Sequence, residues 1–277
     1  MHLINADLHS HSNVSDGTLP PEAIAARAHA LGVELWALTD HDELGGQARA
    51  RDAALALGMD YLTGTEISVS FAGETVHIIG LGFDADDAAL RTGLAKAGIA
   101  GAFEGALRYV SNPDLISRTH FARFLVDTGI CPDTHSVFRR YLTQGHPGYV
   151  PHAWAKLGDA VRWITGAGGV AVIAHPARYR FSPTAEYALF TEFIAHGGQG
   201  VEVMTGSHSH SEQLKYADTA REFGLLASRG SDFHSPEESR IELGSLPDLP
   251  GTLQPVWGAL QDRIQRATST SSITSPA

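Results

Sequence analysis

Cysteine, long apolar runs and positive charge are all scarce in this sequence. Its 277 residues include one cysteine, Cys131, which excludes an internal disulfide and a metal site built from several thiolates. Any bound metal ion must therefore be held mainly by nitrogen and oxygen atoms. No apolar run reaches the roughly 18 residues that a membrane span needs, so we expect no membrane partner.

Positive charge is outweighed by negative charge. Lys and Arg number 20 against 31 Asp and Glu, which gives a formal charge of -11. Long nucleic acid is held by many Lys and Arg contacts to phosphates, so we expect no long DNA partner. A short anionic substrate is compatible with the negative net charge, because bound divalent cations invert the local field. The opening MHLINADLHSHS lacks the basic start and apolar stretch of a signal peptide, and we expect a cytoplasmic protein.

Short apolar runs alternate with helix-like stretches along most of the chain. A predicted strand over residues 3–9 precedes a helix that Pro21 opens and Gly32 closes. Continuous apolar runs such as VAVIA suit a parallel sheet that is covered on both faces. Further strands are predicted at residues 34–39, 169–174, 200–204 and 225–228. The alternation predicts an α/β fold.

Two segments depart from this rhythm. Between residues 61 and 83, YLTGTEISVSF and ETVHIIGLGF flank Ala72-Gly73 and predict a β-hairpin. Residues 98–157 are aromatic and rich in Arg and His without a clear buried strand, and we interpret them as an inserted helical lid subdomain. Residues 1–97 and 158–265 then form the main domain, and the polar tail 266–277 is predicted to be disordered.

Ionisable residues recur where the predicted strands end. Asp7, His9 and His11 alternate along the first strand, so their side chains share one face. Asp40 and His41 end the second strand, the place where α/β barrels carry functional groups. The same pattern returns at three later residues, which are His175, Asp232 and His234. This repetition favours a cluster of metal ligands.

The hairpin carries two more ionisable residues inside apolar strands. Glu66 and His77 are expected close together across the ladder. Buried charged groups are rarely tolerated without a partner or a metal ion. Each residue taken alone is also compatible with an ordinary hydrogen-bonded core group, and only the agreement among segments favours a metal site.

These motifs resemble those of the polymerase and histidinol phosphatase (PHP) family over nearly the whole chain outside the tail. The first motif matches Asp7, His9 and His11 followed by Asp16, the second matches Asp40 and His41, the third matches His175, and the fourth matches Asp232 and His234. Glu66 and His77 fit the remaining ligand positions. The resemblance implies a distorted, usually seven-stranded β/α barrel with an inserted helical subdomain.

The family also implies three divalent metal ions. Mn²⁺ is favoured, and Fe²⁺ and Zn²⁺ are the alternatives. By this resemblance the first ion takes His9, His11, Glu66 and Asp232, the second takes Glu66, His77 and His175, and the third takes Asp16, His41 and His234. Asp7 and Asp40 are expected behind these ligands, where they would orient imidazoles by hydrogen bonds.

The insert resembles the PHP branch that removes the 3'-phosphate of nucleoside 3',5'-bisphosphates and leaves nucleoside 5'-monophosphates. Relatives of that branch also trim short RNA from the 5' end. On this basis Arg118, Thr119 and His120 are assigned to the phosphate that is not cleaved. Arg178 is assigned to the reacting phosphate, and Tyr149 to stacking on the base.

The implied reaction is attack on phosphorus by a metal-bound hydroxide, with His208 as a candidate proton donor to the leaving group. Two alternatives stay open at this point. A histidinol-phosphate-type phosphatase would share the metal ligands but would not need residues for a second phosphate. A metal-holding module without catalysis, such as those attached to polymerases, is the other. The sequence predicts no oligomeric state.

Overall fold

The strands form two sheets of different size. The computed structural model describes residues 4–97, 118–142 and 154–268. The small sheet is parallel, in the order β1 (Ala6–Asp7), β2 (Leu35–Trp36) and β3 (Asp60–Tyr61). The large sheet has the order β6 (Ala155–Lys156), β4 (Gly64–Phe71), β5 (Glu74–Leu81), β7 (Val170–Ile173), β8 (Gly200–Thr205) and β9 (Leu226–Gly230). Strand β5 runs antiparallel to both of its neighbours, and the other pairs are parallel.

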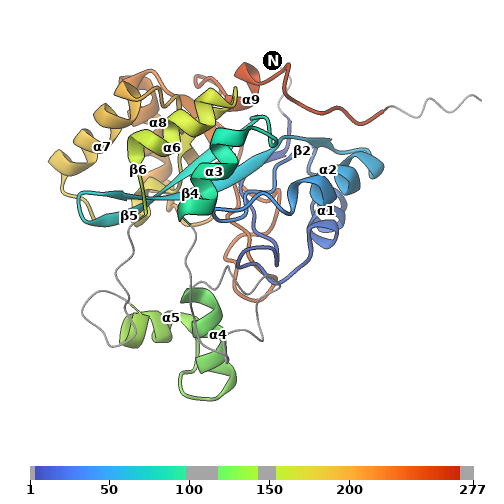
Figure 1. Cartoon of the computed structure of the whole chain (residues 1–277), viewed down its shortest axis with the longest axis vertical. Helices are drawn as coiled ribbons and strands as arrows, with labels where there is room; N and C mark the ends of the chain where they lie inside the picture. Colours follow the sequence, from blue (N-terminus) through green and yellow to red (C-terminus); the bar gives the residue numbers. More distant parts are fainter. Residues whose placement is uncertain (1–3, 98–117, 143–153, 269–277) are drawn as a thin grey trace, which may run out of the picture.

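Helices flank both sheets (Figure 1). At one end of the molecule, α1 (Pro21–Ala30) and α2 (Gln47–Ala56) share an apolar core with Trp36 and Tyr61 of the small sheet. Across the molecule, α6 (Leu157–Gly166), α7 (Pro183–Ala195) and α8 (His210–Phe223) pack on the large sheet. Other helical segments are α3 (Ala88–Ala97), η4 (Pro176–Arg178) and α9 (Val256–Ala259). No helix in the described ranges is long and apolar enough to cross a bilayer.

Isolated bridges connect the two sheets. Ser10, beyond β1, pairs with Phe233, beyond β9, and His41, beyond β2, pairs with Glu66 of β4. The predicted α/β class is confirmed. Over the described residues, however, the strands form two sheets and no closed one, so a continuous seven-stranded barrel is not confirmed.

The predicted hairpin is confirmed as β4 and β5. Its turn residues Ala72 and Gly73 have φ of 48° and 85°, and positive φ at both central positions is the geometry that matches strand twist in a two-residue turn. Glu66 stands opposite Ile79, and His77 stands opposite Ser68. Glu66 and His77 are therefore diagonal neighbours on one face of the ladder, as expected.

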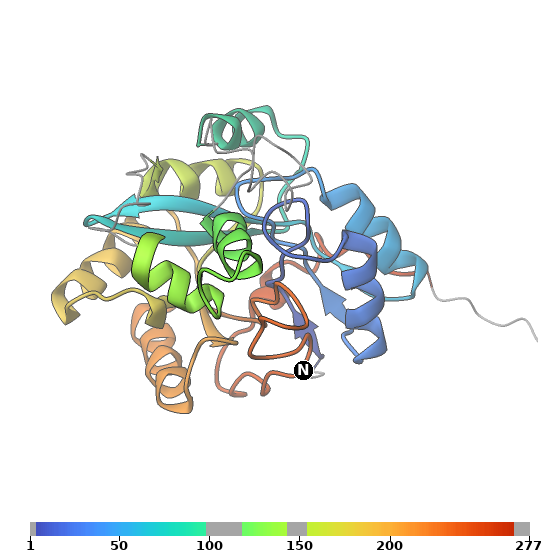
Figure 2. The same ribbon diagram turned by 90° about the horizontal axis from the view of Figure 1, so that it is seen from below.

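Between Arg118 and Leu142 the predicted insert is helical, whereas its last described residues form the strand β6 and the start of α6. It contains α4 (Arg118–Asp127), α5 (Thr134–Val137) and a π-helical turn η3 (Phe138–Leu142), which enclose a small core of Ala122, Cys131, Val137 and Leu142. Seen from below, α4 and α5 lie in front of the strands (Figure 2). Residues 98–117, 143–153 and 269–277 lie outside the described residues, so the domain boundaries stay a prediction. Arg266, the first residue of the predicted tail, donates to Asp60 at 2.7 Å.

Candidate metal centre

The predicted ligands converge where the strands end. His9 and His11 follow β1, His41 follows β2 and Asp232 follows β9, while Glu66 lies inside β4. Among the described residues, the candidate ligands form three groups, and within each group the donor atoms all lie within 4.8 Å of one another. They are His9, His11, Glu66 and Asp232; His11, Asp16, His41 and His234; and His41, Glu66 and His77.

The inner group, His9, His11, Glu66 and Asp232, is the most deeply buried. His9 Nε2 lies 3.0 Å from His11 Nε2 and 3.2 Å from Glu66 Oε2. Asp232 Oδ1 lies 3.3 Å from His9 Nε2 and 3.4 Å from His11 Nε2. Four tetrahedral donors about 2.1 Å from one ion stand roughly 3.4 Å apart. The spacing therefore fits one metal ion, and the set is the one expected for the first ion.

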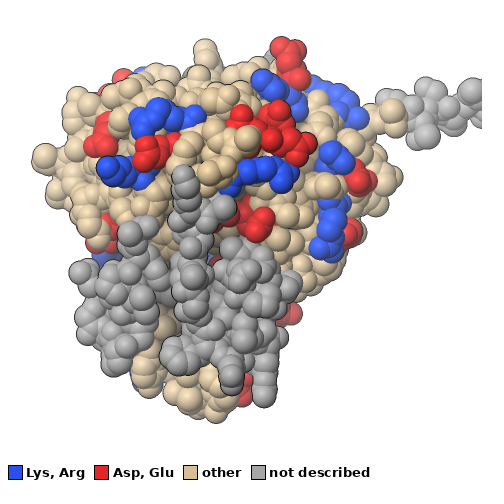
Figure 3. Space-filling view, in the orientation of Figure 1, with Lys and Arg blue, Asp and Glu red and all other residues tan. Residues whose placement is uncertain are grey.

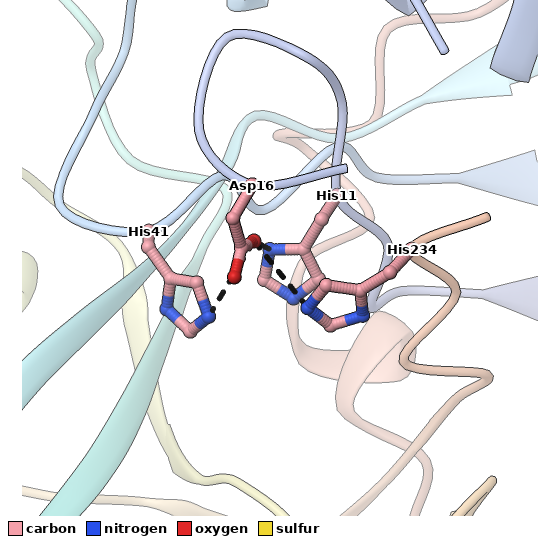
Figure 4. A group of neighbouring side chains, drawn as sticks. All are labelled: His11, Asp16, His41 and His234. Carbon is pink, nitrogen blue, oxygen red and sulfur yellow. Dashed lines mark ion pairs between the residues drawn. The ribbon is translucent and has the colours of Figure 1, made fainter. Parts of the chain in front are cut away.

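The outer group, His11, Asp16, His41 and His234, surrounds one carboxylate oxygen (Figure 4). Asp16 Oδ1 lies 3.4 Å from His234 Nε2 and 3.9 Å from both His41 Nε2 and His11 Nδ1. This set contains every ligand expected for the third ion and adds His11. His11 faces both groups, because its Nε2 belongs to the inner group and its Nδ1 to the outer one.

The carboxylate of Glu66 faces imidazoles through both of its oxygens. Oε2 lies 3.2 Å from one ring nitrogen each of His9, His11 and His41. Oε1 lies 3.0 Å from His77 Nδ1 and from His175 Nε2. The residues expected for the second ion are thus brought together around Oε1. Its two oxygens serve different sets of imidazoles, as expected of a bridging ligand.

Most of the buried polar side-chain atoms without a hydrogen-bond partner, among the described residues, belong to the candidate ligands. They are His11 Nδ1, Asp16 Oδ1, His41 Nδ1, Glu66 Oε2, His175 Nδ1 and Asp232 Oδ1. An unsatisfied buried polar group costs about 1–3 kcal/mol, and more when it is charged. Such a concentration of unsatisfied nitrogen and oxygen donors fits divalent cations as the missing partners.

Electrostatics gives four candidate ligands, Glu66, Asp232, His41 and His175, the protonation state that metals require. Burial alone would raise the pKa of Glu66, but the surrounding imidazoles hold it well below its ordinary value. The pKa of Asp232 is lowered in the same way by His9 and its other cationic neighbours, against the effect of burial. Burial lowers the pKa of His41 and of His175 to about 3. Anionic carboxylates and neutral imidazoles are the forms that bind metal ions. Burial alone would lower the pKa of His9 and of His11, but the neighbouring carboxylates raise both, so these two rings must release a proton when a metal ion binds.

Two ligands adopt strained backbone conformations. His175 has a φ of 25° and Asp232 a φ of 58°. Left-handed conformations at residues other than glycine cost on the order of 1–3 kcal/mol each, and they cluster at functional sites. The turns after β7 and β9 therefore hold these two side chains toward the groups at the expense of local backbone energy.

The expected roles of Asp7 and Asp40 need correction. Both are buried, but neither carboxylate contacts an imidazole. Asp7 accepts from the backbone N–H groups of Ser231 and Gly244, at 2.9 and 2.8 Å. Asp40 accepts from the backbone and hydroxyl of Ser12, both at 2.7 Å, and from the hydroxyl of Ser15. The two carboxylates therefore hold the loops that carry the candidate ligands, because the loops supply the backbone N–H groups and hydroxyls that donate to them.

Glu202 performs the role that was expected of those aspartates. The Nδ1–H of His9 donates to Glu202 Oε1 at 3.0 Å, which leaves Nε2 of the ring facing the inner group. Glu202 Oε2 accepts from the backbone N–H of His175 at 2.7 Å. Glu202 was not among the predicted site residues. Its signal was a carboxylate inside the apolar run GVEVMT, the same signal that identified Glu66.

His208 is placed away from the ligand groups. Its Nδ1–H donates to the Val203 carbonyl at 3.1 Å, and its Nε2 accepts from the Ala177 N–H at 3.3 Å. Its ring also stacks on Tyr216. Because both ring nitrogens are hydrogen-bonded to the backbone, neither is free to give a proton to a leaving group, and this geometry argues against the predicted role as proton donor.

The expected substrate residues fall into two sets. Arg178 is half exposed beside the inner group, and its guanidinium donates to Asp232 Oδ2 at 2.8 Å. Thr119 does not point to a separate phosphate site, because its hydroxyl donates to Asp16 Oδ2 at 3.1 Å. The side chains of Arg118 and His120, and the whole of Tyr149, lie outside the described residues, so their assignments stay predictions.

Buried histidines and carboxylates converge at the strand ends of an α/β fold, an arrangement that fits a centre of metal ions. The chain belongs to the PHP domain family, whose model matches residues 7–167. The family expected from the motifs is therefore confirmed.

Relatives cover nearly the whole chain. The 3',5'-nucleoside bisphosphate phosphatase of Chromobacterium violaceum is 50% identical, over 95% of this chain and 99% of that protein. A 5'-3' exoribonuclease of Haemophilus influenzae is 38% identical, over 91% of this chain and 97% of that protein. A solved amidohydrolase of Chromobacterium violaceum with bound sulfate and no metal has a TM-score of 0.91 at 49% identity, over 96% of this chain and 99% of that one.

Proposed function

We propose that this chain is a metal-dependent phosphatase that removes the 3'-phosphate of nucleoside 3',5'-bisphosphates and leaves nucleoside 5'-monophosphates. The observation that carries the proposal is the set of unsatisfied donors around Glu66. It occurs in a chain that is 50% identical, over 95% of its length, to a nucleoside bisphosphate phosphatase. Complete ligand groups favour an enzyme over a metal-holding module without catalysis.

The proposed cofactor is a cluster of three divalent ions, with Mn²⁺ preferred. The inner group would hold one ion, Glu66 with His77 and His175 a second, and the outer group a third. When bound, these ions supply a hydroxide nucleophile at neutral pH and neutralise charge on the phosphoryl oxygens. Glu202 contributes by keeping the His9 ring in the tautomer that presents Nε2 to the inner group.

Arg178 is the proposed clamp on the reacting phosphate. Its side chain is 51% exposed and is fixed at one nitrogen by Asp232. A planar guanidinium presents several N–H donors in a fork that suits phosphate oxygens. The contact to Asp232 orients this fork beside the inner group, so a phosphate that enters the site is oriented before it reacts.

The second phosphate and the base are assigned to the insert. We retain Arg118 and His120 for the phosphate that is not cleaved, and Tyr149 for the base. On the face drawn in Figure 3, outside the grey residues, acidic and basic side chains are interspersed. This supports a small anionic substrate over long DNA. We also place the protein in the cytoplasm, where nucleotides and short RNA are found.

Trimming of short RNA from the 5' end is the second candidate activity. It is favoured by the exoribonuclease of Haemophilus influenzae, which is 38% identical over 91% of this chain. The two activities are compatible, because both require a phosphate ester at the metal ions and a nucleotide held beside them. A histidinol-phosphate-type activity lacks a comparable relative among those described above.

The test is phosphate release by the manganese-loaded protein from adenosine 3',5'-bisphosphate, 5'-AMP and histidinol phosphate, with products identified by mass. Fast release from the bisphosphate, with 5'-AMP as product, is expected. Preference for histidinol phosphate would overturn the substrate and keep the metal site. A 5'-phosphorylated RNA trinucleotide in the same assay tests the second activity, for which nucleoside 5'-monophosphates are the expected products.

A further inference from the structure

Helix α4 of the insert contacts the ligand loops directly through Arg123. The guanidinium Nη1 group donates to the backbone carbonyl of Asp16 at 2.6 Å. The Nη2 and Nε groups donate to the two carboxylate oxygens of Glu238, at 2.6 and 3.3 Å. The Arg123 side chain is 10% exposed. One side chain of the insert therefore connects the loop that carries Asp16 to the loop that carries Glu238.

The Glu238 loop in turn holds another ligand of the outer group. The hydroxyl of Ser239 accepts from the backbone N–H of His234 at 2.8 Å. The N–H of Glu238 donates to the hydroxyl of Ser235 at 3.0 Å, which closes the loop on itself. Arg123 thus fixes the separation of two loops that each supply one member of the outer group, Asp16 and His234.

Thr119, one turn before Arg123 on α4, acts on the same ligand. Its hydroxyl donates to Asp16 Oδ2, at 3.1 Å. The other oxygen, Oδ1, is the one that faces His11, His41 and His234 and has no hydrogen bond of its own. The hydroxyl therefore selects which carboxylate oxygen Asp16 presents to the imidazoles, and it lowers the entropy lost when that oxygen takes a metal ion.

We propose that α4 is a built-in part of the outer metal site, in which Arg123 and Thr119 are positioning residues for Asp16. Neither residue is a metal ligand. The proposal rests on the metal-dependent site of the proposed function but not on its substrate. It gives the insert a role in metal binding, in addition to the contacts with substrate that the sequence predicts.

The test is titration of the metal-free protein with Mn²⁺. Binding is measured by calorimetry and by the electron paramagnetic resonance signal of free Mn²⁺. Partners that orient a metal ligand typically contribute about 10- to 100-fold in metal affinity. For Arg123→Gln and Thr119→Val, one equivalent of Mn²⁺ is expected to bind weaker by about that factor. The remaining equivalents should keep the wild-type affinity.

Arg123→Lys adds a graded comparison. Lysine keeps the positive charge but cannot donate to a carbonyl and to both oxygens of a carboxylate in one plane. In Arg123→Lys, the affinity of the weakened equivalent of Mn²⁺ should therefore lie between its values in wild type and in Arg123→Gln. The matched control is Arg140→Gln, which changes an exposed arginine of the same insert and should titrate as wild type does.

Wild-type affinity for every equivalent in both Arg123→Gln and Thr119→Val would overturn the proposal, and so would equal weakening of all equivalents. Should Arg123→Gln fail to fold, as judged by circular dichroism, Thr119→Val decides, because it removes one hydroxyl and keeps the side-chain shape. The titration uses no substrate. A wild-type protein that binds Mn²⁺ but leaves adenosine 3',5'-bisphosphate intact would overturn the proposed activity alone.

Discussion

The inner and outer groups are supported by different parts of the molecule. The side chains of His9 and Glu66 are fully buried, whereas His41 and His234 are 22% and 21% exposed. The inner ligands sit on or beside strands whose opposite faces belong to the apolar core. The outer ligands sit on loops that are held by side chains, through Asp40, Thr119, Arg123 and Ser239. The core therefore preorganises one group, and a polar network preorganises the other.

The largest expected effect comes from Glu66→Ala, because one oxygen of Glu66 faces His11 and His41 and the other faces His77 and His175. Loss of the shared carboxylate should lower kcat/KM on adenosine 3',5'-bisphosphate by about 1,000-fold or more, roughly 4 kcal/mol. Metal content, measured by plasma mass spectrometry, should fall as well. Glu74→Ala, which changes an exposed carboxylate of the same hairpin, is the control. Full activity of Glu66→Ala would refute the cluster.

Glu202→Gln tests the support of His9 in the inner group and of the neighbouring His175, and it changes no residue that supports the outer group. The carboxylate accepts from His9 with one oxygen and from the His175 N–H with the other, and glutamine can replace only one of these acceptors. We expect about 10- to 100-fold weaker binding of the inner ion. Titration with Mn²⁺ measures it, and the equivalent that weakens in Thr119→Val should be unchanged here. If the same equivalent weakens in both variants, the two groups are not independent.

The contrast between the groups explains what the sequence could predict. Ligands such as His9, His41 and Asp232 lie at strand ends, and local periodicity together with the ends of apolar runs locates them. The choice of partner by Asp7 could not be predicted in this way. It depends on the approach of Ser231 and Gly244, which are more than two hundred residues away in the chain.

The fold follows the same division. The helix from Pro21 and the hairpin at Ala72-Gly73 were predictable because proline, glycine and apolar periodicity act locally. The interruption of the ring of strands was not predictable. It lies where the two sheets are connected by isolated bridges, between Ser10 and Phe233 and between His41 and Glu66. A pattern of apolar residues carries no information about how far such pairing continues.

Asp40→Asn tests the polar network of the outer group, and its expected effect is smaller than that of Glu202→Gln. Asp40 accepts from the backbone of Ser12 and from the hydroxyls of Ser12 and Ser15. An amide can accept through only one of its two ends, so at least one donor loses its partner. We expect about 1–2 kcal/mol lower stability in urea and about 10-fold lower kcat/KM. Unchanged stability together with unchanged kcat/KM would show that the loop keeps its shape without this carboxylate.

His208→Gln should give the smallest effect, because His208 belongs to neither group. Its two backbone hydrogen bonds predict a stability loss of about 1 kcal/mol at pH 7.5. The expected change in kcat/KM is less than about 10-fold, since no proton passes through the ring.

The pH dependence of stability tests whether His208 is neutral in the folded protein. Burial lowers the pKa of His208 in the folded protein, whereas the unfolded chain has the ordinary value of about 6.5. Above that pH the stabilising contribution of the neutral ring is complete. As the pH falls below it, the unfolded chain takes up a proton that the folded protein refuses, so wild type loses stability and His208→Gln lacks this loss. The difference between their urea midpoints, measured on metal-free protein, should therefore narrow from pH 7.5 to 5.5. A difference that widens would mean that His208 is charged in the fold and open to proton transfer.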